Sequence, residues 1–109
     1  MIVKRIHENL GVEDGALRFL GIWDTVLEEK MAVTPHVHEN VEEVYYIMEG
    51  RGEMRIGEEE KIVEEGDLVY IPPREIHSLI QVGSKPLRFI TIRVVVSGME
   101  KPRPPPYIV

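Results

Sequence analysis

The stretch HVHENVEEVYYIMEG, from His36 to Gly50, is the part of the chain around which the other features are arranged. It begins with two histidines separated by one residue and ends in a run of Val, Tyr and Ile, residue types that favour β-strands. On a strand, His36 and His38 project from the same face about 6–7 Å apart. Imidazoles placed in this way can bind one metal ion, and we expect His77, which follows Pro72-Pro73, to join them.

The same ion needs a further ligand, and the sequence offers Glu42 or Glu43. An unbroken strand would put Glu42 on the face of His38 and Glu43 on the opposite face, because side chains alternate. Asn40 is a turn-forming residue between them, so we expect the chain to bend there and to start a new strand. Alternation therefore leaves both glutamates open.

Length and composition limit the class of protein. A chain of 109 residues with 43% hydrophobic and 29% charged residues forms one globular domain. Its net charge of −6 argues against nucleic-acid binding, which needs a basic face. There is no cysteine, so disulfides and thiolate ligands are excluded.

The amino-terminal residues do not form a signal peptide and no apolar run is long enough for a membrane helix, so we expect a cytoplasmic protein. The scarcity of amide residues and the abundance of Glu and Lys point to a thermostable one.

Short runs of apolar and β-branched residues alternate with Gly, Pro and acidic turn signals, the pattern of an all-β sandwich or barrel. Gly21 is a candidate bulge, Pro35 marks an edge or a kink, and residues 57–60 are expected to form an acidic hairpin tip. The Pro-rich composition after residue 97 predicts a β-barrel over residues 1–97 and a tail over 98–109. The expected strands cover residues 2–6, 17–23, 32–38, 43–49, 53–56, 61–64, 68–71, 76–82 and 87–96, with residues 27–31 a strand or an irregular link.

The stretch from His36 to Gly50 resembles the first motif of the cupins, His-x-His, three or four residues, Glu, six residues, Gly. Here the motif reads His36, His38, Glu43 and Gly50, so the resemblance favours Glu43 over Glu42 as the ligand.

The second cupin motif is matched at Gly66, Pro72 and His77. Arg74 stands at its second glycine and Gln81 at its asparagine, which puts the tight-turn geometry at Arg74 in question. The resemblance implies a jelly-roll barrel, the double-stranded β-helix of the cupins. It also implies one divalent transition-metal ion, Mn, Fe, Ni, Co, Cu or Zn, held by His36, His38, Glu43 and His77.

Such a centre implies a metalloenzyme of the dioxygenase, decarboxylase or isomerase type acting on a small organic substrate, without identifying a general acid or base. The alternatives are a non-catalytic ligand-binding or sensor module, or a barrel whose histidines only make hydrogen bonds.

We expect a homodimer in which the first strand or the tail crosses to the partner, because open sheet edges need cover. Arg74 and Arg93 could hold an anionic substrate but more simply serve structural roles, and Tyr45, Tyr46 and Trp23 are expected to be packing residues.

Overall fold

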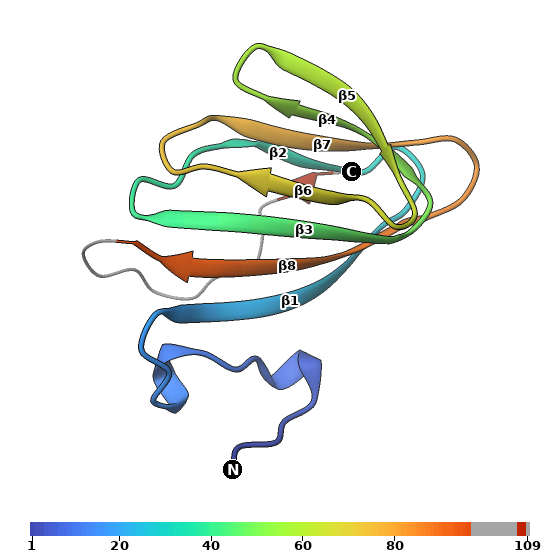
Figure 1. Ribbon diagram of the computed structural model, residues 1–109. Coiled ribbons are helices and arrows are strands. Elements are labelled where there is room, and N and C mark those ends of the chain that lie inside the picture. Colours follow the sequence, from blue (N-terminus) through green and yellow to red (C-terminus); the bar gives the residue numbers. More distant parts are fainter. Residues whose placement is uncertain (97–106, 109) are drawn as a thin grey trace.

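The computed structural model describes residues 1–96 and the backbone of residues 107–108, and strands dominate this part of the chain (Figure 1). Two antiparallel sheets pack face to face, with the strand order β1-β8-β3-β6 in sheet A and β5-β4-β7-β2-β9 in sheet B. This confirms the all-β jelly-roll fold. The elements are η1 (Ile6–Glu8), η2 (Val12–Asp14), β1 (Phe19–Leu27), β2 (Ala32–His36), β3 (Val41–Glu49), β4 (Arg51–Ile56), β5 (Glu59–Glu64), β6 (Leu68–Ile71), β7 (His77–Val82), β8 (Leu87–Val95) and β9 (Tyr107–Ile108).

Alternation along the strands places every second side chain between the sheets. On β3, Tyr45 and Ile47 are fully buried, whereas Tyr46 between them is 41% exposed. The buried side chains change from apolar to charged along the strands. On β8, Phe89 belongs to the apolar core, whereas Arg93 further along is charged and pairs in register with Glu43. One end of the interior is therefore apolar and the other polar. The apolar cluster consists of Leu27, Val33, Tyr45, Ile47, Met54, Val63, Ile71, Leu79, Leu87 and Phe89.

The predicted bend near Asn40 is confirmed. β2 ends at His36, β3 begins at Val41, and the chain bends at residues 39 and 40 between them. Because the bend breaks the alternation, Glu43 faces the interior with 1% exposure, and Glu42 takes the opposite side of β3.

Two predicted irregularities are also present. The register of β1 against β8 shifts between Phe19 and Gly21, and that of β2 against β7 shifts between Val33 and His36, around Pro35. The second shift allows His36 to lie opposite His77 in the β2–β7 ladder.

The predicted strand over residues 2–6 is wrong. Residues 1–5 have no regular structure, η1 begins at Ile6, and Val3 is 81% exposed. Figure 1 shows this segment outside both sheets, so within the described chain it has no neighbouring strand to pair with.

The other strands are present; β6 has the expected bounds, and the rest have one or both ends shifted. The second expected strand runs over Phe19–Leu27, and residues 28–31 form a turn rather than a strand. The acidic hairpin tip is shorter than expected, because β5 already begins at Glu59. The expected tail lies mostly outside the described residues, and the backbone of β9 pairs with β2. No helix in the described residues is long and apolar enough to cross a membrane.

Buried Gln81, at the asparagine position of the second motif, ties two loops to β7. Its Nε2 donates hydrogen bonds to the carbonyl oxygens of Gly83 at 2.9 Å and Lys85 at 2.8 Å, and its Oε1 accepts one from the Lys30 amide at 3.1 Å. The amide group at this position therefore joins the loop before β2 and the loop after β7 through their backbone groups.

Gly50, between β3 and β4, is required by both its conformation and its surroundings. Its φ is +81°, and a Cβ atom there would lie 2.3 Å from the carbonyl oxygen of Pro86. Gly83 has a similar φ of +83°, but a Cβ atom there would have no neighbour within 4 Å. The two glycines therefore share a conformation and differ in the space around them.

We therefore predict that Gly50→Ala destabilises the protein much more than Gly83→Ala. The strain of a positive φ is common to both and costs about 1 kcal/mol, whereas the backbone clash at Gly50 brings the total to about 3 kcal/mol or more. Urea unfolding gives both free energies. Equal losses in the two variants would contradict the close approach to Pro86.

Candidate metal centre

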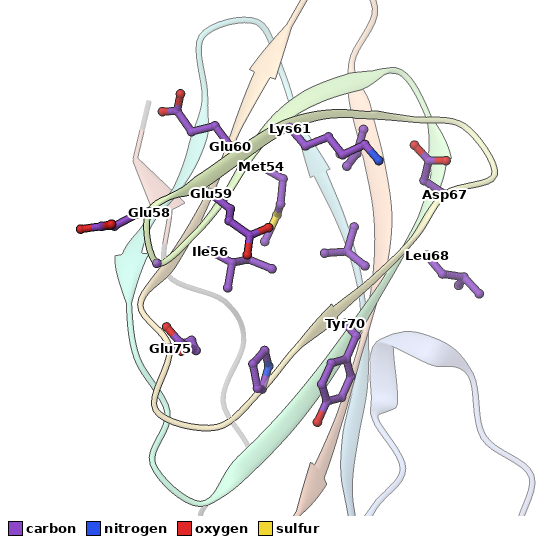
Figure 2. Close-up of a pocket in the computed structure, with 14 residues that line it drawn as sticks. Met54, Ile56, Glu58, Glu59, Glu60, Lys61, Asp67, Leu68, Tyr70 and Glu75 are labelled. Carbon is purple, nitrogen blue, oxygen red and sulfur yellow. The ribbon is translucent and has the colours of Figure 1, made fainter.

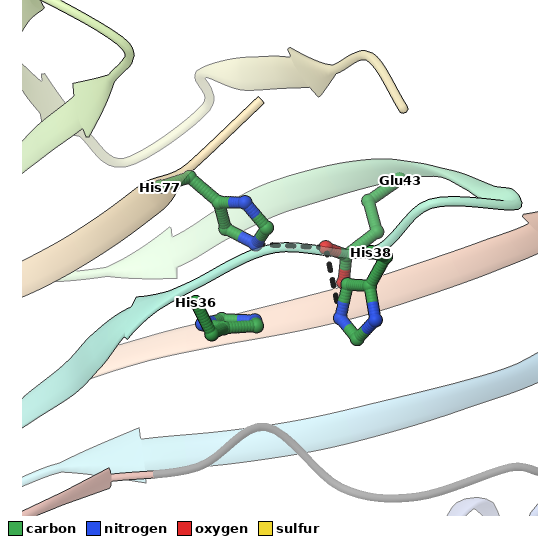
Figure 3. A group of neighbouring side chains, drawn as sticks. All are labelled: His36, His38, Glu43 and His77. Carbon is green, nitrogen blue, oxygen red and sulfur yellow. Dashed lines mark ion pairs between the residues drawn. The ribbon is translucent and has the colours of Figure 1, made fainter. Parts of the chain in front are cut away.

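Four side chains meet at the polar end of the interior (Figure 3). They are His36 at the end of β2, His38 in the bend that follows, Glu43 on β3 and His77 at the start of β7, and all four candidate ligand atoms lie within 4.8 Å of one another. Donors on opposite sides of an ion bound at about 2.1 Å are about 4.2 Å apart. The cluster thus has nearly the size that one ion requires, and Glu43 rather than Glu42 belongs to it.

The donor atoms point at a common centre without hydrogen-bond partners. The Nε2 atoms of His36, His38 and His77 and Oε1 of Glu43 are buried, and none makes a hydrogen bond within the described chain. The shortest approach joins His77 Nε2 to Glu43 Oε1 at 3.0 Å, and His38 Nε2 lies 3.8 Å from the same oxygen. Buried polar atoms normally have partners, so a group of four that lack them is what an ion-binding site presents.

Main-chain carbonyls fix the tautomers of two of the imidazoles. His36 Nδ1 lies 2.8 Å from the carbonyl oxygen of Thr34, and His77 Nδ1 lies 3.0 Å from that of Glu75. A neutral imidazole that donates from Nδ1 has its lone pair on Nε2. Both rings therefore present an acceptor nitrogen to the centre, as metal-binding histidines do.

Arg93 holds the other oxygen of Glu43. Its Nε donates a hydrogen bond of 2.7 Å to Glu43 Oε2, and both side chains are 1% exposed. Its guanidinium carbon also lies 4.7 Å above the ring of Trp23. Glu43 thus turns one oxygen to β8 and leaves the other for the centre.

Burial and neighbouring charged groups shift the pKa values of the side chains in and beside the cluster. Burial by itself would raise the pKa of Glu43, but His77 in its protonated form and the Arg93 guanidinium outweigh it and lower this pKa to about 2. Burial, with Arg93 nearby, lowers the pKa of His38 to about 4, and burial also lowers the pKa of His36. At neutral pH the carboxylate is charged and these imidazoles are neutral, the states in which they bind metals. Burial and the charge of Glu43 raise the pKa of Tyr45, so its phenol keeps its proton.

The two arginines that could have held an anionic substrate have different positions. Arg93 takes the salt-bridged structural role and is inside the barrel. Arg74 is exposed, and it makes the turn before β7 with a φ of +66° while its amide donates a 2.7 Å hydrogen bond to the His38 carbonyl. The turn expected from a glycine therefore forms with an arginine in a left-handed conformation.

A cavity of about 870 Å³ lies between the β4–β5 hairpin and β6 (Figure 2). Met54, Ile56 and Val63 contribute apolar groups, and Glu58 and Glu75 are among the carboxylates around it. None of the four clustered residues lines this cavity, so it is separate from the donor atoms.

The comparisons with known proteins agree with this geometry. The cupin domain family matches residues 24–93. This chain belongs to the cupin family. The uncharacterized protein MJ1618 of Methanocaldococcus jannaschii is 44% identical over 55 residues, which are 50% of this chain and 44% of that relative, so the cupin described here matches less than half of its length.

Solved structures resemble this cupin in fold. A cupin protein from Bacteroides fragilis superimposes with a TM-score of 0.69 and 24% identity, covering 94% of this chain and 88% of that one. A predicted oxalate decarboxylase from Thermotoga maritima superimposes with a TM-score of 0.67 and 20% identity, covering 86% of this chain and 99% of that one. At these identities the likeness is one of fold.

We predict that Arg93→Met strongly destabilises the metal-free protein, because it leaves the Glu43 carboxylate buried without its cation. The expected loss is about 3–5 kcal/mol. Arg88→Met is the matched control, since Arg88 pairs with Asp24 at 2.7 Å but is 41% exposed, and its loss should stay below about 1 kcal/mol. The free energies come from urea unfolding in the presence of a chelator. Similar losses for the two arginines would argue against the buried ion pair.

Proposed function

We propose that this cupin binds one divalent transition-metal ion through His36, His38, Glu43 and His77 and acts as a metalloenzyme on a small organic substrate. The observation that carries the proposal is the convergence of four buried donor atoms that have no other partner in the described chain. Three imidazoles and one carboxylate suit Mn, Fe, Ni, Co, Cu or Zn. They leave one or two positions open on a five- or six-coordinate ion.

The charges at the four-residue cluster favour an anionic substrate. The carboxylate of Glu43 and the guanidinium of Arg93 offset one another, and the imidazoles of His36 and His38 are neutral at pH 7. A bound dication would therefore give the site a net positive charge and polarise a carboxylate, enolate or carbonyl oxygen. Burial of the cluster excludes bulk water and strengthens this attraction. Dioxygenase, decarboxylase and isomerase reactions all use such polarisation.

The second candidate is a non-catalytic module that binds a small anion at the same centre. It rests on the same four buried donor atoms, because anion binding needs them as much as turnover does. Turnover assays on carboxylic acids, diketones and phenolics, run with each candidate metal, separate the two functions. Tight binding of an acid with no turnover by any metal form would favour the module.

We predict that the protein purified without added metal contains close to one equivalent of a transition metal. His36→Gln, His77→Gln and Glu43→Gln should each lower the affinity for Co²⁺ by at least about tenfold, because each removes a donor. His7→Gln is the control, since His7 is exposed in η1 and should leave the affinity unchanged. Metal analysis and competition with a chelator measure these quantities. Less than a tenth of an equivalent, with no uptake of added Co²⁺, would rule out the centre.

We also propose that the protein is a homodimer, and the outer face of sheet A supports this. Tyr46 and Leu68 lie side by side on β3 and β6 and are 41% and 72% exposed, and Tyr70 on β6 is 54% exposed. A second copy of the chain would cover these apolar side chains. The crossing first strand that we expected is not present, and the proline-rich tail lies outside the described residues.

Light scattering tests this assembly. The wild type should have the mass of a dimer, and Leu68→Lys should shift it towards the monomer because it places a charge in the interface. Ile62→Lys, at a 44% exposed position on β5 of sheet B, should remain dimeric. A monomeric wild type at all protein concentrations would contradict the proposal.

Three further features stay proposals that rest on composition and pattern. They are the division into a barrel over residues 1–97 and a tail over 98–109, a cytoplasmic location, and high thermal stability. The pairing of β9 with β2 supports a tail that adds an edge strand to sheet B.

A further inference from the structure

Two hydroxyl groups in the interior have no partner. Tyr45 and Thr91 are both 0% exposed, and neither Tyr45 Oη nor Thr91 Oγ1 makes a hydrogen bond within the described chain. A buried hydroxyl without a partner costs about 1–3 kcal/mol. Two such groups on buried side chains therefore indicate that something else supplies the missing hydrogen bonds.

These hydroxyls come from the layer of the barrel next to the metal centre. In the antiparallel β3–β8 ladder, Glu43 lies opposite Arg93. Tyr45, two residues later on β3, lies opposite Thr91, two residues earlier on β8. Side chains that face one another across antiparallel strands have Cβ atoms about 4.5–5.5 Å apart. Tyr45 and Thr91 are thus neighbours on the inner face, directly beyond the ion pair that orients Glu43.

Tyr45 also contacts one of the candidate ligands. Its ring lies edge-on to that of His77, with the centroids 6.4 Å apart and the planes at 74°, and it packs against Phe89 at 4.9 Å. Ile47 and Phe89, the next pair of buried residues along the two strands, are apolar and 0% exposed. Along the β3–β8 ladder, the residues that carry the two hydroxyls therefore lie between the Glu43–Arg93 pair and the apolar Ile47–Phe89 pair.

We propose that Tyr45 and Thr91 form a subsite that hydrogen-bonds an oxygen of the small carboxylate or related oxyanion bound at the metal centre. This inference rests on the proposed metal-binding function and narrows its substrate class. A hydroxyl donates to a carboxylate oxygen, and such a charge-assisted hydrogen bond is stronger than a neutral one. Because Ile47 and Phe89 close the layer behind the hydroxyls, the ligand has only a few heavy atoms at this end.

Anion binding to the Co²⁺-loaded protein tests the subsite. Formate and acetate are titrated while the visible absorption of Co²⁺ is recorded, and Tyr45→Phe and Thr91→Val are compared with the wild type. Each variant should raise the Kd of the anion by about 5- to 10-fold, the loss of one hydrogen bond. Metal affinity should change by less than about twofold, because neither hydroxyl is a ligand. Tyr46→Phe, on the outer face of the same strand, should leave both affinities unchanged.

The outcomes distinguish an anion subsite from a site for a bridging internal water. Unchanged anion affinity in both variants would overturn the proposal, and lower stability in those variants would then assign the hydroxyls to such a water. A wild type that binds Co²⁺ normally but shows no response to either anion would overturn the subsite alone. A wild type that does not take up Co²⁺ would overturn the metal centre and the subsite together.

Discussion

The buried ion pair between Glu43 and Arg93 is the interaction on which the polar half of the barrel depends. A carboxylate that is 1% exposed would normally take up a proton, and the guanidinium 2.7 Å away keeps it charged. The pair forms only because β3 and β8 are neighbours in the register that sets these two residues opposite one another. It also orients the carboxylate, since one oxygen faces Arg93 and the other faces the histidines.

The surroundings of Arg93 are shaped by a residue with no side chain. Gly21 lies opposite Arg93 on β1, next to the register shift, and a Cβ atom there would come within 2.7 Å of the Trp23 ring. The missing Cβ leaves room for that ring beside the guanidinium, 4.7 Å from its carbon. The bulge at Gly21 and the charge of Glu43 are therefore connected through Arg93.

The candidate centre could be predicted from the sequence because its four residues follow a spacing that two short motifs define. The bend at Asn40 also has a local cause, and it decided the orientation of Glu43 that alternation had left open. The partner of Glu43 could not be predicted, because Arg93 is 50 residues away and only the β3–β8 register joins them. The strand expected over residues 2–6 failed for a similar reason, since apolar residues make a strand only where a neighbour is free to pair. Arg74 adopts a left-handed conformation, with a φ of +66°, at the position where the motif has a glycine.

The imidazoles of His36 and His77 are both oriented by main-chain carbonyl groups, so their orientation does not depend on the side chains of neighbouring residues. Each ring is oriented by the carbonyl oxygen of the residue two places before it, and each of those residues supplies only its main chain. Substitution at Thr34 or Glu75 exchanges a side chain and leaves the acceptor in place. The protonation pattern of the two imidazoles is thus encoded in the path of the backbone, and it can persist in chains that have no residue in common at these two positions.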